Sequence, residues 1–134
     1  MTLMERVDEY FTQAGTFYLA TCDGEQAKCR PLGLHLLIND TLYFAGAIQK
    51  DMVKQMMANP NVEFVATGKD MTFTRLYGKI TVEHDTEITA LILEKNPGLK
   101  KMYENMGLTM GAFHFEHGTV EFRNMMDIAE KIEF

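Results

Sequence analysis

The sequence predicts a mainly β fold, an antiparallel barrel with peripheral helices, in a single domain that spans residues 1–134. Two observations lead to this fold class. About six short segments alternate apolar and polar residues or run apolar like buried strands, and turn residues join most neighbouring segments. Three or four other segments have helical spacing, but strands and helices do not alternate regularly as they do in a doubly wound sheet.

The first expected element is a helix. Thr2 and Glu5 have the spacing of a capping box, in which each residue satisfies a free backbone amide of the other. Apolar residues then recur at helical intervals, and Gly15 ends the helix.

A hairpin follows this helix. Strands are expected at Phe17–Thr21 and Lys28–Ile38, with Asp23-Gly24 as the turn between them. Pro31 lies inside the second strand and predicts an edge or a bulge there, because proline has no amide hydrogen to donate to a neighbouring strand. Gly33 close by supports a break in regular pairing, and ligands often bind where such a break exposes backbone groups.

A second strand pair leads into a helix. Asn39-Asp40 is a turn signal, so Leu42–Ala45 is expected to return antiparallel, and Gly46 loosens the backbone where that strand ends. Helical spacing continues from Lys50 to Ala58, with one apolar face made of Met52, Val53, Met56 and Met57.

The second half of the chain repeats these signals. Asn59-Pro60 ends the Lys50 helix, Asn96-Pro97 opens a later one, and Gly118 separates the last two expected strands. The tail from Asp127 is charged and is expected to fray. The expected strands are Val62–Thr67, Met71–Glu83, Ala112–Glu116 and Thr119–Arg123, and the expected helices are Thr86–Lys95 and Gly98–Met106.

Composition narrows the possible functions. The net charge of −6 argues against general nucleic-acid binding. Two cysteines do not make a disulfide framework, and no apolar stretch has the length of a membrane span or the form of a secretory signal. A reduced, cytoplasmic protein without membrane contact is therefore expected.

Basic residues gather in one part of this acidic chain. The segment from Lys28 to Lys79 has seven basic and four acidic residues, which suits a small anionic ligand, although solvated lysines on strand and helix faces would give the same count. Arg30 begins a strand, and Lys50 and Lys54 share one face at a helix start. Free amides at a helix start carry partial positive charge, so these three side chains form a candidate cradle for a phosphate.

An ordered series of short motifs across roughly residues 5–123 resembles the flavin-binding split barrels related to pyridoxamine 5′-phosphate oxidase. The motifs that carry the resemblance are Phe17-Tyr18-Leu19-Ala20-Thr21, Arg30-Pro31-Leu32-Gly33, Leu42-Tyr43-Phe44-Ala45-Gly46, Gln49-Lys50, Lys54-Gln55, Asn59-Pro60-Asn61-Val62 and Arg75-Leu76-Tyr77-Gly78-Lys79. The resemblance implies a six-stranded antiparallel split barrel and a homodimer that holds flavin mononucleotide (FMN) at the subunit interface, with an unknown small-molecule substrate.

The resemblance also implies which residues bind the cofactor. The phosphate is expected at Arg30, Lys50 and Lys54, with Gln49 beside them, and Arg75 is expected near the flavin, often that of the partner subunit. An exposed strand charge is an equally good interpretation of Arg75. The isoalloxazine ring is expected against Pro31, Leu32, Gly33, Leu34, Tyr43, Phe44, Ala45 and Gly46. One of Tyr43 and Phe44 must instead face the core, because side chains alternate along a strand, and the sequence does not decide which.

The resemblance leaves the reaction open. The chain ends without the arginine-containing segment of true pyridoxamine 5′-phosphate oxidases, so that substrate is not expected. A flavin reductase, a nitroaromatic reductase-like protein or a stress-related redox protein would fit, and no side chain is singled out as a catalytic acid or base. No hydrolase motif is present.

Two alternatives do not require an enzyme. One is a non-enzymatic module for flavin or haem, with His35, His84 or His114 as candidate axial ligands; the other is a barrel that has lost its ligand and serves as an interaction domain. A metal site at His114, Glu116 and His117 is not expected, because a strand points the third residue away from the first two.

Overall fold

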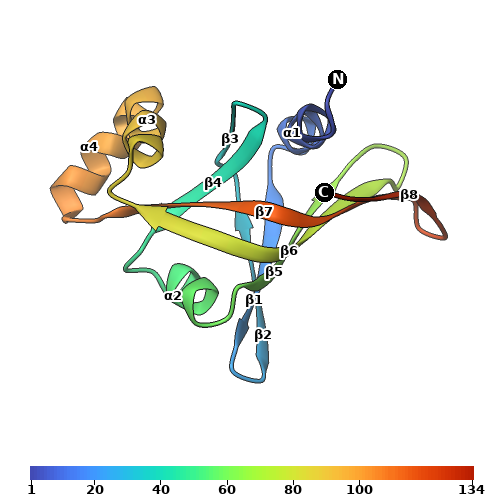
Figure 1. Ribbon diagram of the computed structural model, residues 1–134, viewed down its shortest axis with the longest axis horizontal. Helices are drawn as coiled ribbons and strands as arrows, with labels where there is room; N and C mark the ends of the chain where they lie inside the picture. Colours follow the sequence, from blue (N-terminus) through green and yellow to red (C-terminus); the bar gives the residue numbers. More distant parts are fainter.

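The computed structural model describes residues 1–134 and confirms the predicted fold class, a mainly antiparallel β structure with peripheral helices (Figure 1). The elements, in chain order, are α1 (Leu3–Ala14), β1 (Phe17–Asp23), β2 (Gln26–Leu32), β3 (His35–Ile38), β4 (Thr41–Ala47), α2 (Asp51–Ala58), β5 (Asn61–Thr67), β6 (Phe73–His84), α3 (Glu87–Lys95), α4 (Pro97–Met106), β7 (Met110–Arg123) and β8 (Ile128–Glu133).

The strands form one sheet of eight in the order β2-β1-β5-β6-β7-β4-β3, with β8 added beside β7. The long strand β7 has two partners on one side, β4 along its first half and β8 along its second half. Strands β2 and β3 are the two ends of the main path and do not pair with each other, so the barrel is split rather than closed.

The single strand expected over Lys28–Ile38 is two strands, which is a correction. β2 ends at Leu32 and pairs with β1, whereas β3 begins at His35 and pairs with β4. The predicted break near Gly33 is therefore real, and it carries the chain from one edge of the split sheet to the other. Pro31 lies opposite Tyr18 on the edge strand β2, where its missing amide hydrogen leaves no neighbour unsatisfied.

The C-terminal third differs from expectation in two ways. Gly118 does not divide β7, because it pairs with Gly78 of β6 and continues the ladder. The tail, expected to fray, forms β8, and Phe134 exchanges two backbone hydrogen bonds with Gly118 at 3.0 and 3.1 Å. Charge along an edge strand does not prevent pairing, since the side chains alternate to both faces.

Helices α1 and α2 follow their sequence signals with one exception. The capping box between Thr2 and Glu5 is present at the start of α1, as predicted. Helix α2 buries Met52, Val53 and Met56 against the sheet. Met57 was expected on the same face but is 59% exposed, because it lies next to this apolar stripe rather than on it.

Phenylalanines from five elements fill the barrel. The rings of Phe44 on β4 and Phe64 on β5 stack with centroids 3.9 Å apart, and both side chains are almost fully buried. The other rings in this cluster are Phe11 from α1, Phe17 from β1, and Phe113 and Phe115 from β7. A smaller apolar cluster, which includes Ile92, Tyr103 and Met110, lies where α3 and α4 meet the end of the β6–β7 ladder (Figure 1).

None of the helices combines the length and apolar character needed to cross a membrane.

The space around two glycines predicts opposite effects when each is replaced by alanine. A Cβ atom at Gly118 would lie 2.9 Å from the carbonyl oxygen of Tyr77, so we expect Gly118→Ala to lower the free energy of unfolding by about 1–3 kcal/mol. Gly98 in α4 has open space around it, so Gly98→Ala should raise that free energy by up to about 1 kcal/mol. Urea denaturation of both variants measures the difference; equal effects would contradict the close approach at Gly118.

Candidate functional site

Arg30 reaches from the edge strand β2 across the end of β1 to helix α2. It pairs with Leu19 on the sheet, so its side chain leaves the sheet on the same face as the buried Leu19. The guanidinium donates hydrogen bonds to Thr21 Oγ1 at 2.7 Å, to the Leu19 carbonyl at 3.2 Å and to Gln55 Oε1 at 3.0 Å. Thr21 also donates to Gln55 Oε1 at 2.6 Å, which closes the cluster of three side chains.

The partners of Arg30 are all neutral, which distinguishes it from the other three arginines of the chain. Arg6 pairs with Glu130, Arg75 with Glu63 and Glu121, and Arg123 with Glu121. A half-buried guanidinium without a carboxylate keeps a positive charge that no protein group offsets. The cluster of Arg30, Thr21 and Gln55 is therefore a candidate site for an anion.

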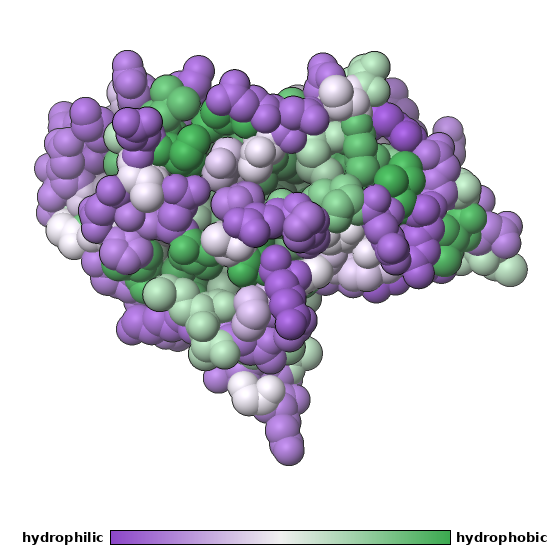
Figure 2. Space-filling model, viewed as in Figure 1, coloured by the Kyte–Doolittle hydropathy of each residue, from purple (hydrophilic) through white to green (hydrophobic).

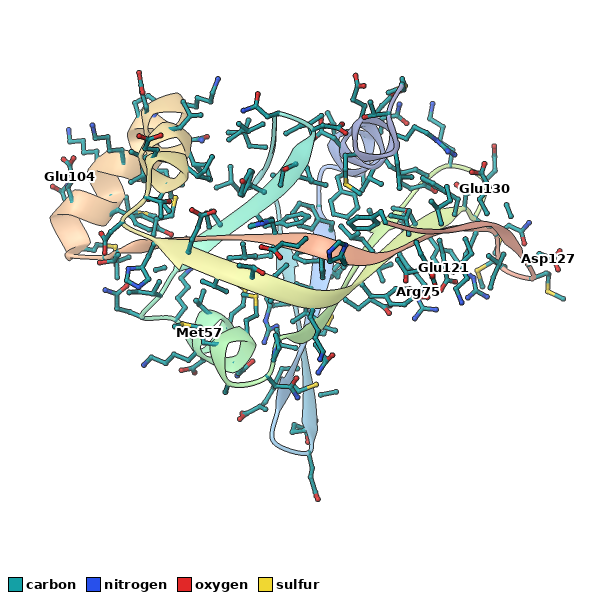
Figure 3. The ribbon with its side chains drawn as sticks, in the orientation of Figure 1. Met57, Arg75, Glu104, Glu121, Asp127 and Glu130 are labelled. Carbon is teal, nitrogen blue, oxygen red and sulfur yellow. The ribbon has the colours of Figure 1, made fainter.

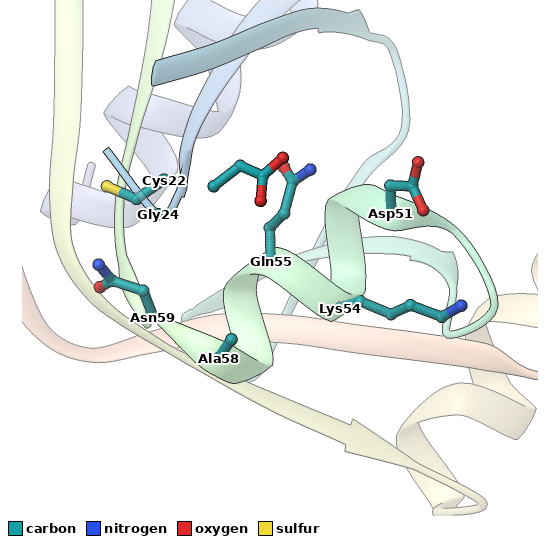
Figure 4. Close-up of a pocket in the computed structure, with 8 residues that line it drawn as sticks. Cys22, Gly24, Asp51, Lys54, Gln55, Ala58 and Asn59 are labelled. Carbon is teal, nitrogen blue, oxygen red and sulfur yellow. The ribbon is translucent and has the colours of Figure 1, made fainter. Parts of the chain in front are cut away.

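A cavity of 520 Å³ lies beside this cluster, between the β1–β2 hairpin and α2 (Figure 4). Its lining residues are Cys22, Asp23, Gly24, Asp51, Lys54, Gln55, Ala58 and Asn59. The hairpin that forms one wall projects from the body of the molecule and ends in a hydrophilic tip (Figure 2). The volume is within the usual range of small-molecule and cofactor sites, about 300–1,000 Å³.

The two lysines predicted for the cradle lie on the same helix as Gln55. Lys54 lines the cavity, and Lys50 is the exposed N-cap residue of α2, one turn earlier. Helix α2 therefore places Gln55 beside β1, while β2 brings Arg30 from the other side. Lys54 extends from the same helix away from Cys22 and Gly24 (Figure 4), and Lys50 does not line the cavity. Asp23 and Asp51 also line the cavity, so its charge is mixed rather than uniformly positive.

The return strand β4 separates the residues expected against a flavin ring. Phe44 faces the phenylalanine core, which settles the alternation left open by the sequence. Tyr43 and Ala45 point to the opposite face and pack with the smaller cluster near α3 and α4. Gly46 packs on α2, since a Cβ atom there would lie 2.7 Å from Met52 Cε. None of these four residues accepts a hydrogen bond from Arg30.

The residues that follow Arg30, from Pro31 to Leu34, end β2 and form the link to β3. Pro31 and Leu32 complete β2, with Pro31 exposed and Leu32 packed at the margin of the core. Gly33 and Leu34 follow in the link to β3, and the only atom within 4 Å of a Cβ placed on Gly33 is a carbonyl oxygen at 3.8 Å. Gln49, just before α2, accepts a hydrogen bond from the amide of Thr109 at 3.2 Å.

Arg75 lies apart from this cluster, in an ionic network on the face of the sheet that is turned away from the core. It donates to both carboxylate oxygens of Glu63 at 2.6 and 2.9 Å, and lies 3.7 Å from Glu121 (Figure 3). Glu121 is only 3% exposed and also accepts hydrogen bonds from Tyr77 and Arg123. The pKa of Glu121 is lowered, first by the hydrogen bond from Tyr77 and then by the two arginines, and the same bond raises the pKa of Tyr77.

The histidines are dispersed. His35 Nδ1 lies 2.7 Å from Asp8 on α1, and His84 Nδ1 lies 2.8 Å from the adjacent Asp85. His114 lies beside the ring of Tyr43, with its buried Nδ1 unpartnered and 4.0 Å from Glu83. No group of three or more His, Cys, Asp or Glu side chains is arranged to hold a metal ion.

Sequence reasoning did not select Thr21 or Gln55 as functional residues. A signal for Thr21 was present, because it follows Phe17 and Leu19 at the period of a strand and so puts a hydroxyl where an apolar residue is expected. Gln55 has no comparable signal, since a polar residue between two buried methionine positions of a helix is ordinarily exposed.

Comparisons with known proteins agree with this geometry. No protein-family model and no curated protein sequence matches the chain. Among solved structures, a NimC/NimA family protein from Clostridium acetobutylicum is 30% identical, with a TM-score of 0.85 over 100% of this chain and 95% of that one. General Stress Protein 26 from Bacillus anthracis is 17% identical, with a TM-score of 0.72 over the full length of both chains. A pyridoxamine 5′-phosphate oxidase-related, FMN binding protein from Nostoc punctiforme is 12% identical, with a TM-score of 0.61 over 100% of this chain and 96% of that one.

The split sheet and the helix that closes on Arg30 thus define a protein of the pyridoxamine 5′-phosphate oxidase-like split-barrel class. Within that class, the chain belongs to the NimC/NimA family.

The buried Glu121 predicts a pH-dependent contribution to stability. Because its pKa is lowered in the folded state, the contribution is complete above the ordinary range of glutamate, about pH 4.3, and is lost as the pH falls through the lowered value. We expect Glu121→Gln to reduce the free energy of unfolding by about 1.5–3 kcal/mol at pH 7, and by less at pH 3.

Denaturation of wild type and variant at both pH values measures this difference. Glu133→Gln, an exposed position on the neighbouring strand β8, serves as the control and should change stability by less than about 0.5 kcal/mol. An effect of Glu121→Gln that is the same at pH 3 and pH 7 would contradict the ionic origin of the contribution.

Proposed function

We propose that the protein binds FMN with its phosphate at Arg30, Lys50 and Lys54, and that it is an oxidoreductase acting on a small molecule. The observation that carries the proposal is the environment of Arg30, a half-buried guanidinium held only by neutral acceptors beside a cavity of 520 Å³. A dianionic phosphate supplies the negatively charged partner that the Arg30 guanidinium lacks.

The donors at the cluster suit a phosphate. A guanidinium has five N–H groups, and three hydrogen bonds to protein atoms leave donors of Arg30 available. The oxygen of the Gln55 side chain is occupied by Arg30 and Thr21, so its NH₂ group, which has no partner in the protein, is free to donate to a ligand. Lys54 and Lys50 add positive charge on flexible side chains, and this charge offsets the negative charge of Asp51 at the same helix start.

We further propose that the flavin ring lies at the interface of a homodimer. The resemblance to pyridoxamine 5′-phosphate oxidase-related proteins supports this arrangement, and one solved neighbour is an FMN binding protein. The ring lies along the segment from Pro31 to Leu34, where the chain passes from β2 to β3, and along strand β4. Gln49 lies beside the phosphate. Arg75, held in place by Glu63 and Glu121, approaches the ring from the partner subunit.

The chemistry of the proposed reaction comes from the cofactor, since FMN accepts and donates hydride or single electrons when bound. Residues of this chain bind the phosphate, orient the ring and keep water from it. No side chain is assigned as a catalytic acid or base.

A double substitution tests the phosphate site. In Arg30→Met/Lys50→Met, two charged contacts to the phosphate are lost at about 1.5–3 kcal/mol each, so we expect the affinity for FMN to fall by at least about 100-fold. Quenching of FMN fluorescence during titration with protein measures the dissociation constant.

The matched control is Lys100→Met/Lys101→Met, which removes the same charge from exposed positions of α4. It should leave the affinity unchanged, and the melting temperature of each variant shows whether it is folded. An unchanged affinity in a folded Arg30→Met/Lys50→Met protein would show that the site is assigned to the wrong residues.

A further inference from the structure

A second cavity lies at the opening of the barrel, below the first turn of α1. Its volume is 130 Å³, and five of its eight lining residues are apolar. Each of these five comes from a different part of the chain: Met4 of α1, Leu42 of β4, Leu76 of β6, Phe115 of β7, and Phe134 beyond β8. Met4 near the N-terminus and Phe134 at the C-terminus thus line the same cavity. The cavity shares no residue with the cavity beside Arg30.

The floor of this second cavity is part of the core. Leu42, Leu76 and Phe115 are each at most 8% exposed and belong to the phenylalanine cluster. An apolar space of this kind holds water poorly, and an engineered cavity of roughly 150 Å³ with similar walls stays dry and binds benzene. The volume therefore suits a body of about six to eight carbon atoms.

The mouth of the cavity is acidic. Asp40, Thr41 and Glu116 complete the lining, and none of the eight residues is basic. Neither carboxylate takes part in an ion pair; Asp40 accepts a hydrogen bond from the hydroxyl of Thr2, and Glu116 is exposed. The backbone fixes Asp40 in position, because Asn39 and Asp40 both have positive φ angles in the β3–β4 turn.

We propose that this second cavity binds a small organic cation, a primary amine with a compact aromatic or branched aliphatic body. The body fills the apolar space, and the ammonium group stays at the mouth, where it donates hydrogen bonds to Asp40 and Glu116. An ammonium has three donors, so it can serve both carboxylates and the hydroxyl of Thr41 together.

Other ligand classes fit the cavity less well. An organic anion meets two carboxylates and no basic group, and a flavin is far too large for 130 Å³. A bare metal ion lacks ligands, since no cluster of three suitable side chains exists in the chain. The cavity is independent of the FMN proposal, so failure of either proposal leaves the other standing.

Binding of three related compounds tests the inference. Benzylamine, benzyl alcohol and benzoate have bodies of similar size and differ in charge. We expect benzylamine to bind about five- to tenfold more tightly than benzyl alcohol at low ionic strength, with benzoate weakest, and the preference for the amine to shrink in high salt. Titration of the ¹³C-methyl signals of Met4, Leu42 and Leu76 measures the affinity and shows whether the ring enters the cavity.

A pair of exposed substitutions tests the acidic mouth. Asp40→Asn/Glu116→Gln keeps the shape of the mouth and should make benzylamine and benzyl alcohol bind equally, whereas Glu133→Gln, outside the cavity, should leave the preference intact. The inference is wrong if benzylamine does not shift these methyl signals. It is also wrong if benzylamine binds wild type no better than benzyl alcohol, or if the preference survives the double substitution.

Discussion

The packing of phenylalanine rings inside the split barrel is the constraint on which the rest of the structure depends. Phe44 and Phe64 stack at the centre, and rings from α1, β1 and β7 surround them. Since side chains alternate along a strand, burying these rings decides which residues of each strand face the core and which face away from it. A shift of one residue in β4 would turn Phe44 out of the core and Tyr43 into it.

The same packing positions the candidate cofactor site. Leu19 and Thr21 share the inward face of β1 with Phe17, and Arg30, paired with Leu19, extends along that face toward α2. The buried methionines of α2 hold this helix against the barrel, which places Gln55 within hydrogen-bond distance of the guanidinium. The site is thus a polar margin of an apolar core, and the half-buried Arg30 with only neutral partners is the feature that most favours an anionic ligand.

Much of this fold follows from the sequence. The capping box of α1, the edge position of Pro31 and the break near Gly33 were all predicted from local chemistry, and the structure shows each of them. The errors arose where long-range pairing overrides a local signal. Gly118 looked like a turn residue, but it pairs with Gly78, and the charged tail forms β8 because β7 offers it a free edge. No pattern within a short window contains that information.

The candidate site was predictable in the same uneven way. Arg30 and Lys54 were both selected from the sequence. Arg30 belongs to the hydrogen-bonded cluster, Lys54 lines the cavity beside it, and Lys50 lies one turn earlier at the start of α2. The neutral partners of Arg30 were not foreseen, because the separation between Thr21 and Gln55 in the sequence gives no sign that they meet. Arg75 looked like a candidate ligand residue by its position in a motif, yet two glutamates from neighbouring strands hold it.

The absorbance spectrum of the freshly purified protein, with the released cofactor identified by mass, shows directly whether the protein binds FMN. We expect the two-band yellow spectrum of a flavin and a released molecule with the mass of FMN. A sharp Soret band would indicate haem and contradict the assignment. A colourless protein that fails to take up added FMN would also contradict it, and the charge of Arg30 would then require a different anion.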